Sequence, residues 1–498
     1  MHLLVRLLFF YKYSYKLKYY IINLLLYAIF DSANVFIRSY SKMAAQLLLR
    51  RRRADVDMTE GNIFRHLITF AFPLLLGNLF QQFYNTVDTW VVGNYVSNEA
   101  FSAVGSVGPI INMLIGFFLG FSSGAGVVIS QYYGAQQYDK VKKTVHTAVS
   151  LTVILGIILT AVGIAVTPYM LTFMKMPAEA FDEARLYLTI YFSGILGLML
   201  YNLGSGILRA VGDSQRPFYF LVVSALLNTV LDLVFVIGFG MGVDGVALAT
   251  IIAQGASALL CFVVLFKTSS CVKVAFLDMK IDKESSFKIV KIGFPTALQM
   301  TITSFSNVFV QSYVNYFGTD CMSGWTAYSK LDAFLFLPMQ SLSIAATTFV
   351  GQNLGKNDVV RAKKGVNVAM LMSFVSTFII MLPMIIFAPH FVNFFNKEPA
   401  VVEFGTVFLR YITPFYLICC VNQIYSGALR GAGNTRAPMI IMLVSFVFFR
   451  QAYLFVMANY ISNTILPIAM AYPAGWLLCS LVNFIYYRRV DLSKTRVV

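Results

Sequence analysis

Charged residues are scarce in this chain, and their scarcity excludes an ordinary soluble domain. Asp, Glu, Lys and Arg make up 12% of the 498 residues, whereas a soluble globular protein carries roughly 25%. Hydrophobic residues make up 58%, and the mean hydropathy is +0.72. A composition this apolar is typical of a chain that lies within a membrane.

Histidine and cysteine are also few. The four histidines are scattered, and the six cysteines show no metal-ligand spacing and fall mostly in apolar runs. We interpret the cysteines as small buried hydrophobic residues. No His/Glu metal motif and no serine–base pair stands out, so the sequence indicates neither an enzyme nor a cofactor.

What the chain does contain is a series of apolar runs of about 20 residues, the length of a helix that crosses a bilayer. Alternation of apolar and polar residues is weak, which argues against a β-barrel. We predict an all-α polytopic membrane protein with twelve transmembrane helices. The expected spans are 63–90, 100–131, 144–167, 184–208, 217–238, 244–266, 287–317, 324–350, 365–388, 404–429, 438–459 and 464–487.

Basic residues are concentrated in every second loop. They lie in the segments 131–143, 209–216, 267–291, 356–364, 430–436 and 488–498. The other loops contain almost no basic residues, with Lys175 and Lys397 as the exceptions. Because cytoplasmic loops carry such an excess of Lys and Arg, we predict a plasma (inner) membrane protein with both termini cytoplasmic. This placement explains the net charge of +16, and we expect no nucleic-acid partner.

Two motifs recur with the same offset of 221 residues. The recurring pairs are Gln131-x-x-Gly134 with Gln352-x-x-Gly355, and Gly206-x-Leu208-Arg209-x-x-Gly212 with Gly427-x-Leu429-Arg430-x-x-Gly433. A duplicated bundle is the usual architecture of a secondary transporter, with the substrate site between the copies. Since each half has an even number of helices, the two six-helix repeats should share one orientation.

The spans and loops divide the chain into five segments. The segments are 1–60, an N-terminal extension outside the fold; 61–267, the N lobe; 268–286, a cytoplasmic linker; 287–487, the C lobe; and 488–498, a cytoplasmic tail. Residues 1–42 contain no clean run long enough to span and no convincing signal peptide. We therefore expect a working protein that starts at Met43 or Met58.

The predicted spans contain only three acidic residues, Asp88, Asp232 and Asp332. A charge at mid-bilayer costs about 2.5–3.5 kcal/mol on insertion scales, so such residues usually face a cavity or a partner. Asn228 lies one helical turn before Asp232, and we expect Thr250 at a similar depth in the next helix. Oxygen ligands of this kind suit a proton or a monovalent cation rather than a transition metal. For Asp332 we favour a structural role at the entrance of a span.

Six further polar residues are candidates for a substrate cavity. They are Gln81, Tyr84 and Asn85, which share roughly the helix face of Asp88, and Gln299, Asn307 and Arg450 from the second half. Arg450 lies in the middle of a predicted span, where a charge is costly. Either it neutralises an acid of the cavity or its side chain extends to the membrane surface, and the sequence leaves both interpretations open.

With these motifs the chain resembles the multidrug and toxic compound extrusion (MATE) family, and most of all its bacterial DinF-like branch. The resemblance covers about 60–490. The residues that carry it are Asn85-Thr86-Val87-Asp88, Gln131-x-x-Gly134, Leu208-Arg209-x-x-Gly212-Asp213, Asn228-x-x-x-Asp232, Ala247-Leu248-Ala249-Thr250, Gly351-Gln352-Asn353 and Gly427-Ala428-Leu429-Arg430-Gly431.

The resemblance implies a secondary transporter that exports cationic or lipophilic drugs and toxins in exchange for H⁺ or Na⁺ by alternating access. It implies no cofactor besides the coupling ion, and a monomer in contact with membrane lipids. The implied cation site comprises Asp88, Asn228, Asp232 and Thr250. Some relatives have a glutamate in the seventh helix, at the position that Thr303 occupies here. We therefore expect the N lobe to carry the coupling.

Four other functions fit a helical membrane protein. The main alternative is a lipid or lipid-linked saccharide flippase of the same superfamily. Such proteins usually have several basic residues lining the cavity, whereas Arg450 is the main candidate here. The segment from Gly351 to Lys356 resembles the phosphate loop of an ATP-driven pump, but it has three residues between the glycines where that motif needs four. An intramembrane enzyme lacks a recognisable motif, and the two-lobe repeat disfavours a channel.

Overall fold

The computed structural model describes residues 56–96, 98–174 and 176–498, which belong to one compact unit. These residues form helices and connecting turns, and they contain no strand. The side chains of some helical residues, Asn85 among them, lie outside the description. The expectations for residues 1–42 also fall outside the described residues.

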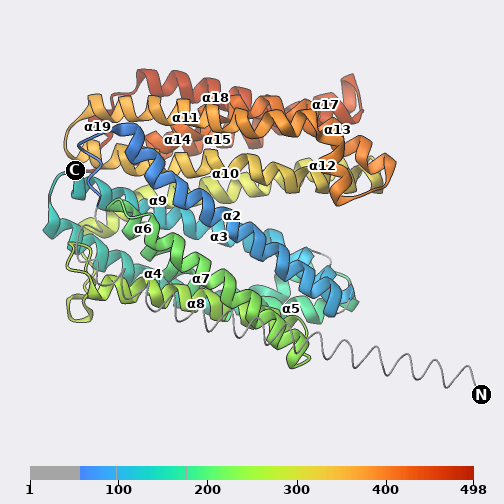
Figure 1. Cartoon of the computed structure of the whole chain (residues 1–498), viewed down its shortest axis with the longest axis horizontal. Coiled ribbons are helices and arrows are strands. Elements are labelled where there is room, and N and C mark those ends of the chain that lie inside the picture. The colour runs from blue at the N-terminus through green and yellow to red at the C-terminus, as the bar shows by residue number, and fades with distance from the viewer. Residues whose placement is uncertain (1–55, 97, 175) are drawn as a thin grey trace, which may run out of the picture. The chain divides into compact units, whose positions relative to one another are not determined.

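The first half of the unit forms a bundle of helices that we call the N lobe (Figure 1). Its helices are α2 (Ile63–Tyr95), α3 (Asn98–Gly134), α4 (Tyr138–Phe173), α5 (Ala178–Ser193), α6 (Ile195–Ala210), α7 (Gln215–Asp232) and α8 (Val243–Lys267). The axes of α5 and α6 meet at 46°. A π-helical segment, Leu233–Gly238, continues α7.

The second half forms the C lobe. Its helices are α9 (Lys283–Asn315), α10 (Thr319–Gly355), α11 (Val359–Ile386), α12 (Ala388–Phe395), α13 (Pro399–Ile412), α14 (Tyr416–Gly431), α15 (Arg436–Met442), α16 (Arg450–Val456), α17 (Ile465–Ala469), α18 (Ala471–Arg489) and α19 (Leu492–Thr495). A second π-helical segment, Leu443–Phe449, joins α15 to α16.

Most of the long helices are apolar enough to cross a membrane. Ten described helices qualify on length and composition, or eleven if the bent pair α5 and α6 forms one span. The predicted all-α polytopic fold is confirmed, and helices occupy each of the twelve expected segments. The difference lies at α9, which is long enough but too polar to be counted. It packs against α3, α10 and α15, so protein surrounds much of its polar surface.

The offset of 221 residues recurs in the backbone and in the hydrogen bonds. Gly212 and Gly433 stand at corresponding turns with φ angles of 88° and 90°, a conformation that glycine adopts without steric cost. Two corresponding hydrogen bonds, both 2.7 Å long, run from Ser122 Oγ to the Asn202 carbonyl and from Ser343 Oγ to the Gln423 carbonyl. The repeated motifs therefore form equivalent local structures in the two lobes.

Helix α2 packs against both lobes. Its first part contributes Phe70 and Leu74 to a buried cluster with α10 and α11 of the C lobe. Its last part contributes Val91 and Val92 to a cluster with α3, α5 and α8 of the N lobe. In Figure 1 this helix, drawn in blue, runs obliquely between the two groups of helices. Helix α2 therefore connects the surroundings of Asp88 to the C lobe.

Small residues allow α3 of the N lobe and α9 of the C lobe to cross closely. A Cβ atom at Gly120 would overlap the backbone of Ala297, and one at Gly124 would overlap the backbone of Gly293. Such contacts between small residues are a common way for helices to associate in membranes. The two lobes therefore touch along the half of the bundle where α3 ends and α9 begins.

At that end of the bundle, two glutamines cross between the lobes. Gln131 of α3 donates from Nε2 to the carbonyl of Gly431 at 2.8 Å. Gln352 of α10 donates from Nε2 to the carbonyl of Ala210 at 2.9 Å. Donors and acceptors are both related by the 221-residue offset. We call this symmetric pair of contacts the glutamine latch.

Both ends of the described chain join the glutamine latch. The backbone N–H of Met58 donates to Gln352 Oε1 at 2.9 Å, and the N–H of Val497 donates to Gln131 Oε1 at 2.7 Å. Each terminal segment therefore contacts both lobes, since Val56 N–H also donates to the carbonyl of Val211 at 2.9 Å and Arg496 donates to Asn357 Oδ1 at 2.7 Å. The two bundles are consequently closed against each other at this end.

The segment 56–60, which the sequence assigns to an extension outside the fold, is packed in the structure. Met58 is fully buried against α10 and α11, and Arg361 donates to the carbonyl of Met58 at 3.1 Å. The Glu60 carboxylate pairs with Lys356 at 2.8 Å, and this hydrogen bond raises the pKa of Lys356 above its ordinary value. These partners lie about 300 residues further along the chain, so no local sequence pattern indicates the contact.

Candidate functional site

Two carboxyl groups meet inside the N lobe. Asp88 lies in the last third of α2, and Asp232 is the last residue of α7. These helices pack together, and the two carboxyl groups are close enough to interact with each other. Two ionised carboxylates at such a separation repel each other, and a proton or a cation between them removes the repulsion.

The acid pair has few protein partners. Asp232 is fully buried, and Asn228, one turn earlier on α7, is 1% exposed. Asp88 Oδ1, both Asp232 oxygens and the Asn228 amide form no hydrogen bond with any described residue. Buried polar groups normally have partners. This group of unpaired oxygens can therefore hold a proton or a small cation.

Tyrosines surround the acid pair. Tyr84, one turn before Asp88 on α2, interacts electrostatically with Asp88 and shares a hydrogen bond with Gln81. Tyr187 of α5 interacts electrostatically with both acids, and its ring stacks on Tyr191 with a centroid separation of 6.4 Å. The helical spacing predicts Gln81 and Tyr84 on this face, but no local pattern indicates the two α5 tyrosines, which lie in a separate span among many other aromatic residues.

Thr250 is less closely associated with the acid pair than the sequence predicts. Its hydroxyl donates to the carbonyl of Val246 in its own helix at 3.0 Å, and it forms no hydrogen bond with Asp88 or Asp232 in the described structure. Among the described residues, no three His, Cys, Asp or Glu side chains gather as they would around a transition metal. The donor set of the N-lobe site consists of oxygens and one amide.

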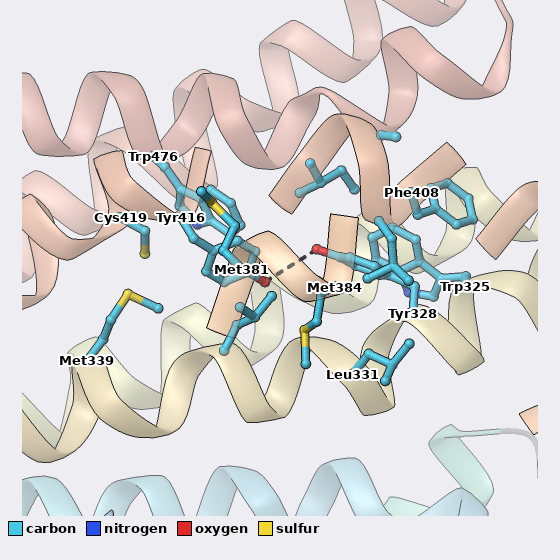
Figure 2. Packing of buried hydrophobic residues seen from close by; sticks show 14 of the residues in the cluster. Trp325, Tyr328, Leu331, Met339, Met381, Met384, Phe408, Tyr416, Cys419 and Trp476 are labelled. Carbon is cyan, nitrogen blue, oxygen red and sulfur yellow. Dashed lines mark hydrogen bonds between the residues drawn. The ribbon is translucent and has the colours of Figure 1, made fainter. Parts of the chain in front are cut away.

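A cavity of about 340 Å³ lies inside the C lobe. Its wall combines aromatic side chains with polar ones. The lining residues are Thr303, Asn307, Gln311, Trp325, Tyr328, Ser329, Asp332, Phe336, Cys419, Asn422, Gln423, Met442, Phe446, Arg450, Tyr472 and Trp476. Figure 2 shows the buried cluster that packs beside this cavity, in which the hydroxyl groups of Tyr328 and Tyr416 are 3.3 Å apart.

Arg450 faces this cavity and does not extend to the membrane surface. The residue is 2% exposed. Its Nη2 donates to Ser306 Oγ at 2.6 Å and to Asn307 Oδ1 at 3.0 Å. The guanidinium also lies over the rings of Phe446 and Tyr472, 5.4 and 4.8 Å from their centroids. Of the two interpretations that the sequence leaves open, the structure supports a residue of the cavity.

Asp332 lines the same cavity from α10. The Tyr328 hydroxyl donates to Asp332 Oδ1 at 3.4 Å, so the carboxyl group has one weak protein partner. The sequence favours a structural role for Asp332 at a span entrance, but its place on the cavity wall makes it a second candidate for ligand contact. No local pattern distinguishes these roles, because the cavity forms only when α9, α10, α14 and α18 pack together.

The six predicted substrate-cavity residues are thus divided between the lobes. Gln81 and Tyr84 lie with the N-lobe acid pair, and the side chain of Asn85 lies outside the described part of the structure. In the C lobe, Asn307 and Arg450 line the cavity. Gln299 donates to the sulfur of Met442, a cavity residue, at 2.7 Å, and so supports the wall from behind.

A π-helical segment adjoins a charged residue in each lobe. Asp232 immediately precedes the segment Leu233–Gly238, and Arg450 immediately follows Leu443–Phe449. Such segments leave the regular backbone hydrogen-bond pattern and are frequent at functional sites. Two repeated helical lobes, each with buried ionisable groups beside an irregular helix, define a polytopic membrane transporter.

The chain belongs to the MatE family. The model of this family matches residues 73–234 and 295–454, one stretch in each lobe, and the resemblance that the sequence motifs carry is confirmed. Members of this family are secondary transporters, so the protein is a transporter and not an enzyme.

The chain is similar to two Bacillus subtilis proteins along most of its length. It is 30% identical to the probable multidrug resistance protein YpnP over 87% of this chain and 96% of the relative. It is 28% identical to the probable multidrug resistance protein YoeA over 88% of this chain and 97% of the relative. A solved outward-facing structure of a multidrug resistance MATE transporter superposes with a TM-score of 0.82 at 22% identity, covering 87% of this chain and 97% of that one.

Proposed function

We propose that this transporter exports cationic or lipophilic drugs and toxins across the plasma (inner) membrane, in exchange for H⁺ or Na⁺. The names of the relatives support a role in multidrug resistance. The observation that carries the exchange is the buried contact between Asp88 and Asp232. Two carboxyl groups inside a membrane protein are stable when a proton or a cation lies between them. When both are ionised and no cation is bound, the two carboxylates repel each other.

The coupling site is the acid pair with Asn228, and Thr250 contributes from α8 only if its hydroxyl turns away from Val246. Binding of the ion draws Asp88 and Asp232 together, and release of the ion separates them. Because Asp88 lies on α2, a change in this separation moves a helix that also packs into the C lobe. Ion binding in the N lobe can thereby change how the two lobes contact each other.

Alternating access requires that the closed end of the bundle opens. The loops and the two terminal segments at the glutamine latch are rich in basic residues. Such residues favour the cytoplasmic side of a membrane. The latch consists of hydrogen bonds between the lobes, each worth about 1 kcal/mol net. Contacts of this strength hold one conformation and still allow the other.

Exchange supplies the energy that export of a cation needs. Moving a monovalent cation out against an inside-negative potential costs about 2.3 kcal/mol per 100 mV, and one H⁺ or Na⁺ that enters returns the same electrical work. A proton gradient adds about 1.4 kcal/mol for each pH unit. Efflux from proteoliposomes under separately imposed H⁺ and Na⁺ gradients identifies the ion, and efflux that responds to neither gradient contradicts the proposal.

Thr303→Ala should leave ion-driven efflux close to wild type. The Thr303 hydroxyl donates to the carbonyl of Gln299 in its own helix at 2.8 Å, and no acid occupies this position. Efflux from proteoliposomes under the active gradient measures the effect. A variant that is well expressed but does not respond to the gradient would place coupling in the C lobe instead.

A further inference from the structure

The linker between α8 and α9, residues 268–282, is bound along α4 of the N lobe. Its side chains Val272 and Val274 are buried in the same cluster as residues of α4 and α6. Lys142 of α4 pairs with Asp278 of the linker at 2.6 Å. Because the linker is the covalent connection between the lobes, these contacts hold the beginning of α9 against the N lobe.

Three consecutive turns of polar contacts join α4 to the linker and to the first turn of α9. Thr147 Oγ1 accepts the N–H of Asp282 at 3.0 Å, and Thr144 Oγ1 lies 3.3 Å from Ser285 Oγ. The third contact comes from His146. We call the contacts of Thr144, His146 and Thr147 the linker clamp. Hydroxyl groups do not titrate near neutral pH, so His146 is the member of the linker clamp that can respond to pH.

Both ring nitrogens of His146 have partners, although the residue is only 2% exposed. Nδ1 lies 2.7 Å from the carbonyl oxygen of Lys142, and the backbone N–H of Ala275 in the linker donates to Nε2 at 3.0 Å. A carbonyl oxygen only accepts and a backbone N–H only donates, so Nδ1 carries the ring proton and Nε2 is the acceptor. The contact with the linker therefore requires the neutral ring.

A proton on Nε2 removes this contact. The nitrogen becomes a donor that points at the N–H of Ala275, which is also a donor. The backbone N–H then loses its acceptor, and a backbone donor left without a partner inside a protein is unfavourable.

The acids of the linker and of the first turn of α9 already have partners. Asp278 pairs with Lys142, and Asp282 caps the N-terminus of α9. Glu284 pairs with Lys288 at 2.6 Å. A positively charged ring would therefore compete with existing contacts for each of these carboxylates.

The other charged or titratable residues of the surrounding elements are mostly basic. They are Tyr132 of α3, Asp139, Lys140 and Lys143 of α4, Arg209 of α6, Lys267 of α8, and Lys273 and Lys280 of the linker. Asp139 is exposed to solvent, where its charge is screened. The surroundings thus add like-charge repulsion to the lost hydrogen bond when the ring of His146 is protonated.

The ring lies at the end of the bundle that carries the C-terminus, where the linker also lies (Figure 1). Helix α4 has 36 residues, which corresponds to about 54 Å, whereas the core of a bilayer is about 30 Å thick. His146 stands in the first third of this helix, beside the linker. The basic loops at this end favour the cytoplasmic side.

We propose that His146 is a sensor of cytoplasmic pH that releases the linker from α4 when the cytoplasm becomes acidic. Histidine is the side chain that ordinarily changes its charge between about pH 5 and 8. The neutral ring accepts the N–H of Ala275, so the linker is bound at the upper end of this range. The protonated ring has lost that acceptor, so the linker is released as the pH falls.

Release of the linker loosens the end at which the two lobes are closed. The linker clamp holds the beginning of α9, the helix that crosses α3 closely at Gly120 and Gly124. It therefore stabilises the same conformation as the glutamine latch. Acid favours opening toward the cytoplasm, and this consequence for transport rests on the proposed alternating access. The dependence of the linker contact on pH does not rest on it.

Hydrogen exchange of the linker tests the proposal directly. The full chain in nanodiscs, without drug and without an ion gradient, is studied by mass spectrometry between about pH 5.5 and 8. Protection is the observed exchange rate around Ala275 relative to the intrinsic rate of the same sequence at each pH. Protection in the wild type should fall about tenfold toward the acid end, which corresponds to about 1.4 kcal/mol.

Variants separate the acceptor from the charge. In His146→Gln the side-chain amide oxygen can accept the N–H of Ala275 at every pH, so protection should stay high and lose its pH dependence. In His146→Leu no acceptor remains, so protection should be low throughout. His66→Gln changes a histidine whose Nε2 lies 2.7 Å from the carbonyl of Glu60, outside the linker, and should behave like the wild type.

Two results would overturn the proposal. One is equal protection of the wild-type linker at both ends of the pH range, which decides the matter even if a variant fails to fold. The other is a pH dependence in His146→Gln that equals that of the wild type, which assigns the response to another group, such as Asp88 with Asp232. Since the assay contains neither drug nor gradient, a failure of the proposed export function does not change its outcome.

Discussion

Asp88→Asn should insert and fold normally but lose gradient-driven export, with efflux from proteoliposomes falling to the level of liposomes without protein. The substitution keeps the size of the side chain and removes its charge and its proton exchange. Asp232 then has no second carboxyl group with which to share a proton or a cation. Binding of drug in the absence of a gradient should persist, because the C-lobe cavity is unchanged.

The matched control is Asp182→Asn, which removes an exposed carboxyl group from α5 of the same lobe and should transport like the wild type. Asp232→Asn should reproduce the loss seen with Asp88→Asn. Wild-type efflux from the Asp88 variant would rule out the N-lobe mechanism. A flippase, or coupling through Asp332, would then account better for the fold.

Gly134→Ala should disfavour the conformation that the glutamine latch closes. A Cβ atom at Gly134 would overlap the carbonyl of Gln352, where α3 of the N lobe crosses α10 of the C lobe. Overpacking of this kind costs about 1–3 kcal/mol, which shifts the balance between two conformations by about 5- to 150-fold. Spin labels at exposed Lys143 and Lys364 should report a longer distance across this end, and export should decrease.

Gly108→Ala is the control on the same helix. Among the described residues, no atom outside the adjoining backbone of this helix lies within 4 Å of a Cβ at Gly108. The extra methyl group should therefore be neutral or slightly stabilising, since alanine favours a helix more than glycine does. An unchanged label distance in Gly134→Ala, with normal export, would show that the transport cycle does not depend on this closure.

Much of the fold could be predicted because the sequence repeats itself. The offset between Gln131 and Gln352 is set by a duplication, and the structure turns the same offset into equivalent hydrogen bonds and turns. The burial of Met58 could not be predicted, because its partners lie about 300 positions away in the sequence. The span expected at 287–317 is present as α9, and the packing of other helices against α9 is what the sequence alone does not show.

The two candidate sites differ in how far the sequence reveals them. Asp88 and Asp232 stand out because carboxyl groups are rare in apolar runs, and the rarity has a physical cause. The C-lobe cavity gives no comparable signal, because its tryptophans and tyrosines belong to a chain with 28 tyrosines and 45 phenylalanines. Only packing shows that Asp332 and Arg450 face one space.

The exchange of ion for substrate is the central claim, and it can be measured in reverse. Proteoliposomes that contain the wild-type chain and an internal pH-sensitive or Na⁺-sensitive dye receive drug on one side only, with no ion gradient imposed. The account predicts that the drug gradient drives H⁺ or Na⁺ in the opposite direction, and that Asp88→Asn abolishes this ion movement. Drug that crosses the membrane with wild-type protein while neither ion moves would contradict the account.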